Sequence, residues 1–183
     1  MGAVLTTLDI PMDGWTVDDL DALPDDDHLR YELVDGCLLV TPPPPLRHQS
    51  AAAQLSFLLH GAVGDGWRVI GEAGLRVDRV NYRVPDIMVI AAAALTKAKA
   101  DPGDMLLAVE VMSPSSVSTD RVAKPAQYAA HGIPHYWRLE LEPAVLVTHV
   151  LDGERYCETG RFLHEVVVEE PVALRFPLAR LLS

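Results

Sequence analysis

Two strongly apolar segments of the chain each contain one carboxylate. Val84–Ala91 reads VPDIMVIA, and Met105–Met112 reads MLLAVEVM. Apolar residues at both odd and even positions are typical of central strands covered on both faces. The link between the segments is short for a crossover helix, so we expect an antiparallel pair. Asp86 and Glu110 would then be buried, where an ionised carboxylate is costly unless it is paired or binds a cation.

The rest of the pattern predicts one domain of mixed architecture. The chain has 183 residues and 49% hydrophobic residues, which suffices for one core. Strands dominate, and helices are expected at Arg47–Val63 and Ser118–His131. The predicted class is α/β (α+β), a sandwich around one central sheet with C-terminal β-hairpins. Further expected elements are a capped helix at Thr16–Leu23, hairpins around Asp35-Gly36 and Asp152-Gly153, strands at Trp67–Asp78 and Tyr136–Leu139, and a last strand at Leu163–Val168.

Charge and composition exclude several classes of protein. Lys and Arg total 15 against 26 Asp and Glu, a formal net charge of -11. This acidity disfavours a chain held on nucleic acid by bulk charge, but not an enzyme that meets phosphate through a cation. No run approaches the roughly 20 apolar residues of a membrane span, so no membrane partner is expected. Cys37 and Cys157 lack metal-ligand spacing, and we expect reduced thiols in a cytoplasmic protein.

The two buried carboxylates predict a metal site. If Asp86 and Glu110 lie side by side on neighbouring strands, their oxygens converge on one divalent cation. Carboxylate, water and phosphate oxygens are the ligands that Mg²⁺ prefers. In the alternative interpretation, each carboxylate caps a backbone group or pairs with Arg83, the one basic residue directly before these strands.

Six short motifs occur in a fixed order between residues 15 and 160. They are YELVDG at 31–36, PPPPLRH at 42–48, VPDIMVI at 84–90, VEVMSPSS at 109–116, the run from Asp120 to Tyr128, and GIPHYW at 132–137. With these motifs the chain resembles the restriction endonuclease-like family of the PD-(D/E)XK nuclease superfamily, a bacterial family. The resemblance implies a restriction endonuclease-like core, which is a mixed central sheet flanked by helices. It also implies an endonuclease that hydrolyses DNA phosphodiester bonds with Mg²⁺ or Mn²⁺. A homodimer would let two such sites cut two strands.

The resemblance also implies roles for individual residues. Asp86 and Glu110 would be the metal ligands. Glu32 would be the early acidic residue that completes the metal site or positions its water. On an alternating strand, Glu32 could instead face solvent.

The lysine departs from the simplest form of the motif. Two residues after Glu110 stands Met112, which holds no charge. The family resembled here carries its lysine on the following helix, where Lys124 matches it. That side chain would stabilise the transition-state charge and lower the pKa of the attacking water. Alternatively, Lys124 is a surface residue paired with Asp120, and Pro125 could kink the helix and misdirect it.

His48 and Tyr128 are further candidates. His48 begins the buried stripe of its helix and could hold a carboxylate or phosphate, although a core histidine is the simpler interpretation. Tyr128 follows Lys124 by one turn and either lines the site or packs. The competing function is a weakly active or inactive nuclease-fold protein with a regulatory or binding role, favoured by the acidity, Met112 and Pro125. A hydrolase of another phosphate ester is a third hypothesis.

Overall fold

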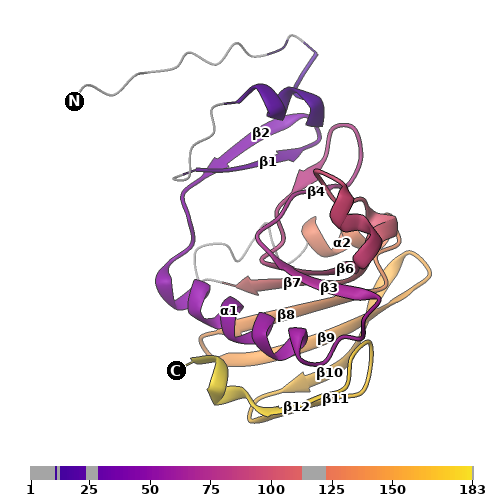
Figure 1. Cartoon of the computed structure of the whole chain (residues 1–183). Coiled ribbons are helices and arrows are strands. Elements are labelled where there is room, and N and C mark those ends of the chain that lie inside the picture. The colour runs from indigo at the N-terminus through magenta and orange to yellow at the C-terminus, as the bar shows by residue number, and fades with distance from the viewer. Residues whose placement is uncertain (1–10, 12, 24–28, 113–122, 183) are drawn as a thin grey trace.

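A six-stranded sheet forms the centre of the molecule (Figure 1). The computed structural model describes residues 11, 13–23, 29–112 and 123–182. In spatial order the sheet contains β10 (Arg155–Phe162), β9 (Ala144–Asp152), β8 (His135–Leu141), β7 (Met105–Met112), β6 (Ile87–Ala91) and β3 (Trp67–Gly71). The mixed sheet and flanking helices confirm the predicted fold class.

The two most apolar strands are neighbours, as their sequences predict. β6 and β7 pair antiparallel, with Ile87 opposite Val109 and Met88 opposite Ala108. Two 3-10 turns, η2 (Ala92–Thr96) and η3 (Pro102–Asp104), fill the link between them. β7 and β8 pair in parallel, and the connection between them contains α2 (Ala123–Ala130). All other pairs in this sheet are antiparallel.

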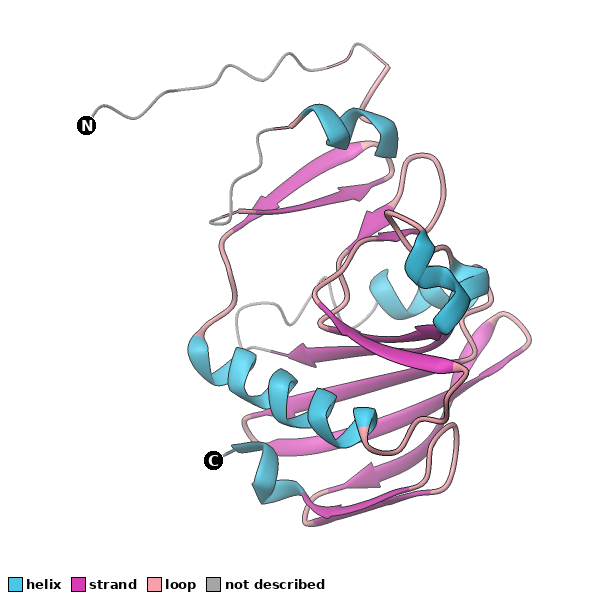
Figure 2. Cartoon of the chain, in the orientation of Figure 1, coloured by secondary structure: helices cyan, strands magenta, loops and turns pink. Residues whose placement is uncertain are grey.

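The sheet is covered on both faces, which explains its non-alternating strands. Figure 2 shows α1 (Leu46–His60) lying across one face. One face buries odd-numbered residues of β6, β7 and β8 with α1; they include Ile87, Val89, Leu107, Val109, Val111, Trp137 and Leu139. The other face buries Met88, Ile90, Ala108 and Tyr136 with Tyr128 of α2. Trp137 is therefore a core aromatic, as expected.

A smaller sheet carries the N-terminal hairpin. Its order is β2 (Cys37–Thr41), β1 (Arg30–Val34), β5 (Tyr82–Arg83) and β4 (Leu75–Arg76). The β1–β2 turn at Asp35 and Gly36 has φ of 49° and 75°, which suits this dipeptide. Before it, η1 (Val17–Ala22) is capped by reciprocal hydrogen bonds between Thr16 and Asp19. The sequence predicted both features.

The C-terminal region corrects one expectation. β11 (Glu165–Val168) was predicted as the last strand, but β12 (Leu174–Pro177) pairs with it antiparallel, and η4 (Leu178–Leu182) follows. Four residues ending in proline give too weak a pattern for a strand prediction. Phe176, Leu178 and Leu181 join the core on the α1 face.

Element boundaries also differ from the predictions. The Trp67–Asp78 segment divides into β3 and β4, with a bend at residues 72–74. α1 ends at His60 with Gly61 as its C-cap, before the Val63 expected from the sequence. The expected helix start at Ser118 lies outside the described residues. Among the described residues, no helix is both long and apolar enough to cross a membrane.

Leu55 should anchor α1 to the sheet. Its side chain is fully buried in the core on the α1 face. We expect Leu55→Ala to lower the free energy of unfolding by about 2–5 kcal/mol because it removes packing and leaves a cavity. Urea denaturation measures the change. Phe57→Ala on the same helix is the control: this side chain is 69% exposed, and its loss should cost about 0.5 kcal/mol or less. Equal costs would contradict the packing described.

Candidate active site

Asp86 lies directly before β6 and connects it to β7 and α1. Pro85 has no N–H to donate to a strand ladder, and β6 begins at Ile87. Oδ2 of Asp86 accepts the backbone N–H of Val111 at 2.7 Å and lies 3.1 Å from Nε2 of His48. His48 is thus buried against a carboxylate, as one interpretation of the sequence predicted.

Glu110 projects from β7 toward α2. Its side chain is 2% exposed. Nζ of Lys124 lies 3.0 Å from Oε2, and the hydroxyl of Tyr128 donates to Oε1 at 2.8 Å. Both oxygens of this carboxylate therefore have a partner on α2.

Lys124 brings two carboxylates together. Its side chain is 4% exposed, so the surface-lysine interpretation is wrong; Asp120 lies outside the described residues. Nζ lies 3.5 Å from Oε1 of Glu32 as well as beside Glu110. Met112, two residues after Glu110, is buried in β7 and carries no charge. The basic group beside Glu110 is that of Lys124 on α2. Pro125 lies in the first turn of the described helix and does not turn Lys124 away.

Glu32 is buried on β1 and does not face solvent. Oε1 accepts the backbone N–H of Val84 at 3.0 Å, and Oε2 lies 3.5 Å from Arg83. Arg83 also donates to Gln127 of α2 through Nε at 2.7 Å. Among the described residues, Arg83 pairs with Glu32 and not with Asp86, so this part of the alternative interpretation is wrong.

Arg30 is a site residue that the sequence reasoning missed. Its guanidinium lies 3.3 Å from Oδ1 of Asp86 and 3.1 Å from Glu72. The signal was present, because Arg30 and Glu32 are two residues apart on one strand and so share a face.

Both carboxylates have basic partners that their own strands do not supply. Their partners come from distant segments: Arg30 and His48 reach Asp86, and Lys124 reaches Glu110. Sequence neighbours could not reveal them, because β1, α1 and α2 meet the strand ends only in the folded chain.

Comparison with known proteins identifies the family. A family model, Uma2, described as "Putative restriction endonuclease", matches residues 17–179. The chain belongs to the Uma2 family. This match extends well past residue 137, where the last of the motifs ends. No curated protein matches the chain.

A solved structure has the same fold. It is the crystal structure of "a putative nuclease belonging to DUF820" from Anabaena variabilis ATCC 29413. The TM-score is 0.72 at 17% sequence identity, and the match covers 91% of this chain and 97% of that chain. This agreement confirms the restriction endonuclease-like fold of the Uma2 chain.

Burial and charge set the protonation of the site. Burial, with Asp86 and Glu32 nearby, raises the pKa of Glu110 from 4.5 to about 7, although Lys124 opposes the shift. Burial would also raise the pKa of Asp86, but the hydrogen bond and charge of His48 keep it below its ordinary value. The pKa of His48 is raised because Asp86 outweighs the effect of burial. Asp86 is therefore ionised, and Glu110 is the carboxyl that titrates near neutrality.

The donor set fits a hard divalent cation through two carboxylates. Among the described residues, no group of three or more His, Cys, Asp or Glu side chains is arranged to hold a metal. Mg²⁺ does not require one, since it keeps several waters and binds one or two carboxylates plus phosphate. Asp86 and Glu110 provide these oxygens if Arg30 and Lys124 yield part of their contacts. Nδ1 of His48 is buried without a hydrogen-bond partner among the described residues and could accept or donate to a bound water.

The raised pKa of Glu110 predicts a pH-dependent stability. Below pH 4.5 the carboxyl is protonated in both folded and unfolded chains. Between pH 4.5 and about 7 the folded chain binds more protons, so stability falls as pH rises. Without divalent metal, we expect wild type to lose on the order of 3 kcal/mol relative to Glu110→Gln between pH 4.5 and 8. Urea denaturation at several pH values in EDTA measures the difference.

Glu169→Gln is the matched control, because Glu169 is exposed. Its difference from wild type should stay constant with pH. A constant difference for Glu110→Gln as well would contradict the assigned burial and charge.

Proposed function

We propose that the chain is a Mg²⁺-dependent endodeoxyribonuclease, with Mn²⁺ as an alternative cofactor. The proposal is supported above all by one arrangement: buried Lys124 contacts Glu32 and Glu110, while Asp86 stands at the end of the neighbouring strand. Ile87 lies opposite Val109 in the antiparallel β6–β7 pair, so the next position along the pair places Asp86 opposite Glu110. Family membership and the fold of the solved relative support nuclease chemistry.

Asp86 and Glu110 would hold the cation. When bound, Mg²⁺ neutralises phosphate charge and lowers the pKa of water. The backbone N–H of Val111 and the imidazole of His48 fix the orientation of Asp86. Tyr128 does the same for Glu110 by donating its hydroxyl proton to Oε1.

Lys124 would act on the phosphate. In the free chain the Lys124 ammonium lies between two carboxylates. Their negative charge favours the ammonium form and holds the side chain in place before substrate binds. A negative phosphate group entering beside Glu110 draws this ammonium toward the oxygens on which charge develops. Glu32 keeps a second contact to Lys124 and anchors it during this movement.

The local charge allows an anionic substrate to approach the acidic protein. Four carboxylates of the network face four basic side chains; the acids are Glu32, Glu72, Asp86 and Glu110, and the bases are Arg30, His48, Arg83 and Lys124. With Glu110 ionised and His48 protonated the network is neutral, although the chain carries -11. Binding of a divalent cation makes the site positive, which favours a phosphodiester.

Two copies of the chain would cut two strands, so the proposal includes a homodimer. It also places the enzyme in the cytoplasm, in keeping with the thiol content. Size-exclusion chromatography with light scattering tests the dimer.

A second candidate is a weakly active or inactive protein of the same fold. It is favoured by Arg30, which lies 3.3 Å from Oδ1 of Asp86, where a cation would bind. If this ion pair never opens, the fold serves as a binding module.

Substitutions in the site should abolish DNA cleavage. We expect Asp86→Ala, Glu110→Ala and Lys124→Ala each to reduce Mg²⁺-dependent nicking of supercoiled plasmid by about 100-fold or more, because each removes charge placed at the reacting group. Gel electrophoresis measures the rate. Glu169→Ala should cut at the wild-type rate. Cleavage that survives all three substitutions would place the chemistry elsewhere.

Metal titration separates the two functions. We expect calorimetry to detect Mg²⁺ or Mn²⁺ binding that is lost in Asp86→Ala and Glu110→Ala and kept in Glu169→Ala. Removing either ligand leaves one carboxylate, which holds Mg²⁺ poorly. Wild-type protein that binds neither ion at millimolar concentration would favour the inactive module.

A further inference from the structure

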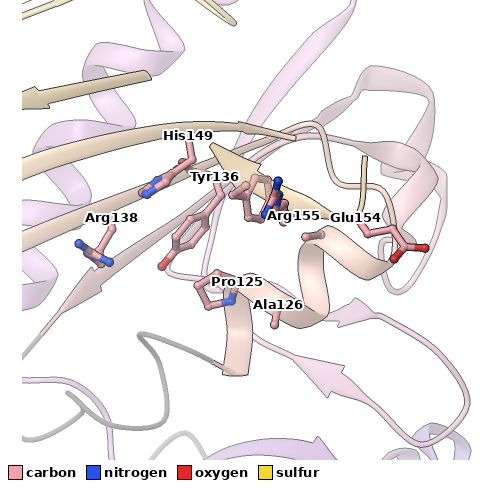
Figure 3. A pocket seen from close by; sticks show the side chains of 9 residues that line it. Pro125, Ala126, Tyr136, Arg138, His149, Glu154 and Arg155 are labelled. Carbon is pink, nitrogen blue, oxygen red and sulfur yellow. The ribbon is translucent and has the colours of Figure 1, made fainter. Parts of the chain in front are cut away.

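A pocket of about 250 Å³ opens between α2 and the outer strands of the sheet. Figure 3 shows Pro125 and Ala126 of α2 on one side and Tyr136 of β8 facing them. His149 of β9 and Tyr156 of β10 also line it. The candidate active site does not use these three strand residues.

The wall on the sheet side is aromatic. Tyr136 and Tyr156 are stacked, with ring centroids 5.5 Å apart and planes at 29°. The ring of His149 lies 5.5 Å from Tyr136. The hydroxyl of Tyr156 donates to the carbonyl of Ile133 at 2.8 Å and so fixes this ring. A rigid platform of this kind suits a flat ring by stacking, at little entropic cost.

The edge of the pocket offers both donors and acceptors. Nδ1 of His149 lies 3.2 Å from the carbonyl of Tyr136 and must donate to it, since a carbonyl only accepts. Burial lowers the pKa of His149, so Nε2 is an acceptor at neutral pH. Arg138 and Arg155 add donors, and Glu154 adds an acceptor. Such a mixture of donors and acceptors matches the edge of a nucleobase.

The pocket adjoins the proposed catalytic residues. Pro125 in its wall directly follows Lys124. Tyr136 lies against Tyr128, with ring centroids 6.2 Å apart, and Tyr128 holds Glu110. Arg138 of β8 lies opposite Glu110 of β7 in the backbone register of this parallel strand pair. Neighbouring strands are about 4.8 Å apart. A strand whose phosphate reaches Lys124 would thus present its next base to this pocket.

We propose that this pocket binds a single unstacked nucleobase of the substrate strand, next to the phosphate that is cut. The inference rests on the proposed nuclease function and extends it to the substrate class. The pocket is below the roughly 300–1,000 Å³ of typical small-molecule sites, which suits one base and excludes a duplex. The substrate is therefore single-stranded DNA, or a base extruded from a duplex.

Fluorescence of 2-aminopurine tests the pocket without cleavage. A short single-stranded oligonucleotide with one 2-aminopurine is titrated with full-length protein in EDTA. Stacking on the tyrosines should quench the fluorescence, and Tyr156→Leu should weaken binding by about tenfold, as expected for the loss of one base–aromatic stack. Tyr156→Phe, which keeps the ring, should restore the quenching. Phe57→Leu changes an exposed aromatic on α1 and is the control for binding elsewhere.

Two comparisons identify the source of the base. An oligonucleotide with an abasic site should bind Tyr156→Leu and wild type equally, because it has no base to stack. Free dAMP should compete only at much higher concentrations than the strand. Competition by dAMP at equal concentration would overturn the proposal, since the pocket would then hold free nucleotide. Equal quenching by wild type and a stably folded Tyr156→Leu would overturn it too.

Cleavage assays separate failure of the pocket from failure of the nuclease. We expect Tyr156→Leu to raise KM for single-stranded DNA about tenfold with little change in kcat. Unchanged KM with normal cleavage would refute the pocket and leave the nuclease intact. Base-dependent quenching without any cleavage by wild type would refute the nuclease and keep the pocket as a binding site.

Discussion

Buried carboxylates have to be neutralised, and this requirement shapes the molecule. Glu32, Asp86 and Glu110 are all withdrawn from water, where three unpaired charges would prevent folding. His48 of α1 pairs with Asp86, and Lys124 of α2 lies beside both Glu32 and Glu110, so β1, α1 and α2 meet at one end of the β6–β7 pair. The same interactions that permit folding without metal hold the carboxylates where a divalent cation and a phosphate could replace those partners.

The two-sided sheet explains why the site lies where it does. Glu110 lies on the same face of the sheet as Ala108, toward α2, whereas Val111 packs in the core on the α1 face. Asp86 stands at the strand end and accepts the N–H of Val111. Side chains of both α1 and α2 therefore reach the site. The aromatic pocket lies farther along the α2 face, so one side of the sheet would receive both the phosphate and its base.

Much of this arrangement follows from sequence patterns, and the remainder does not. The apolar runs predicted the β6–β7 pair, the Asp-Gly dipeptides predicted both hairpins, and the resemblance singled out Lys124 although Met112 breaks the simple motif. His48 was a candidate, but Arg30 was missed as a partner of Asp86, because the two residues lie 56 positions apart and only the shared strand face of Arg30 and Glu32 pointed to it. β12 was missed because a four-residue strand is stabilised by its pairing with β11 and the burial of Phe176 rather than by its own composition.

Crystals soaked in Mn²⁺ test the central claim most directly, because anomalous scattering locates this ion without prior assumptions. The account predicts one strong peak bound by carboxylate oxygens of both Asp86 and Glu110, with Arg30 withdrawn from Asp86. A fully soaked crystal with no peak there, and with Arg30 still paired to Asp86, would contradict it.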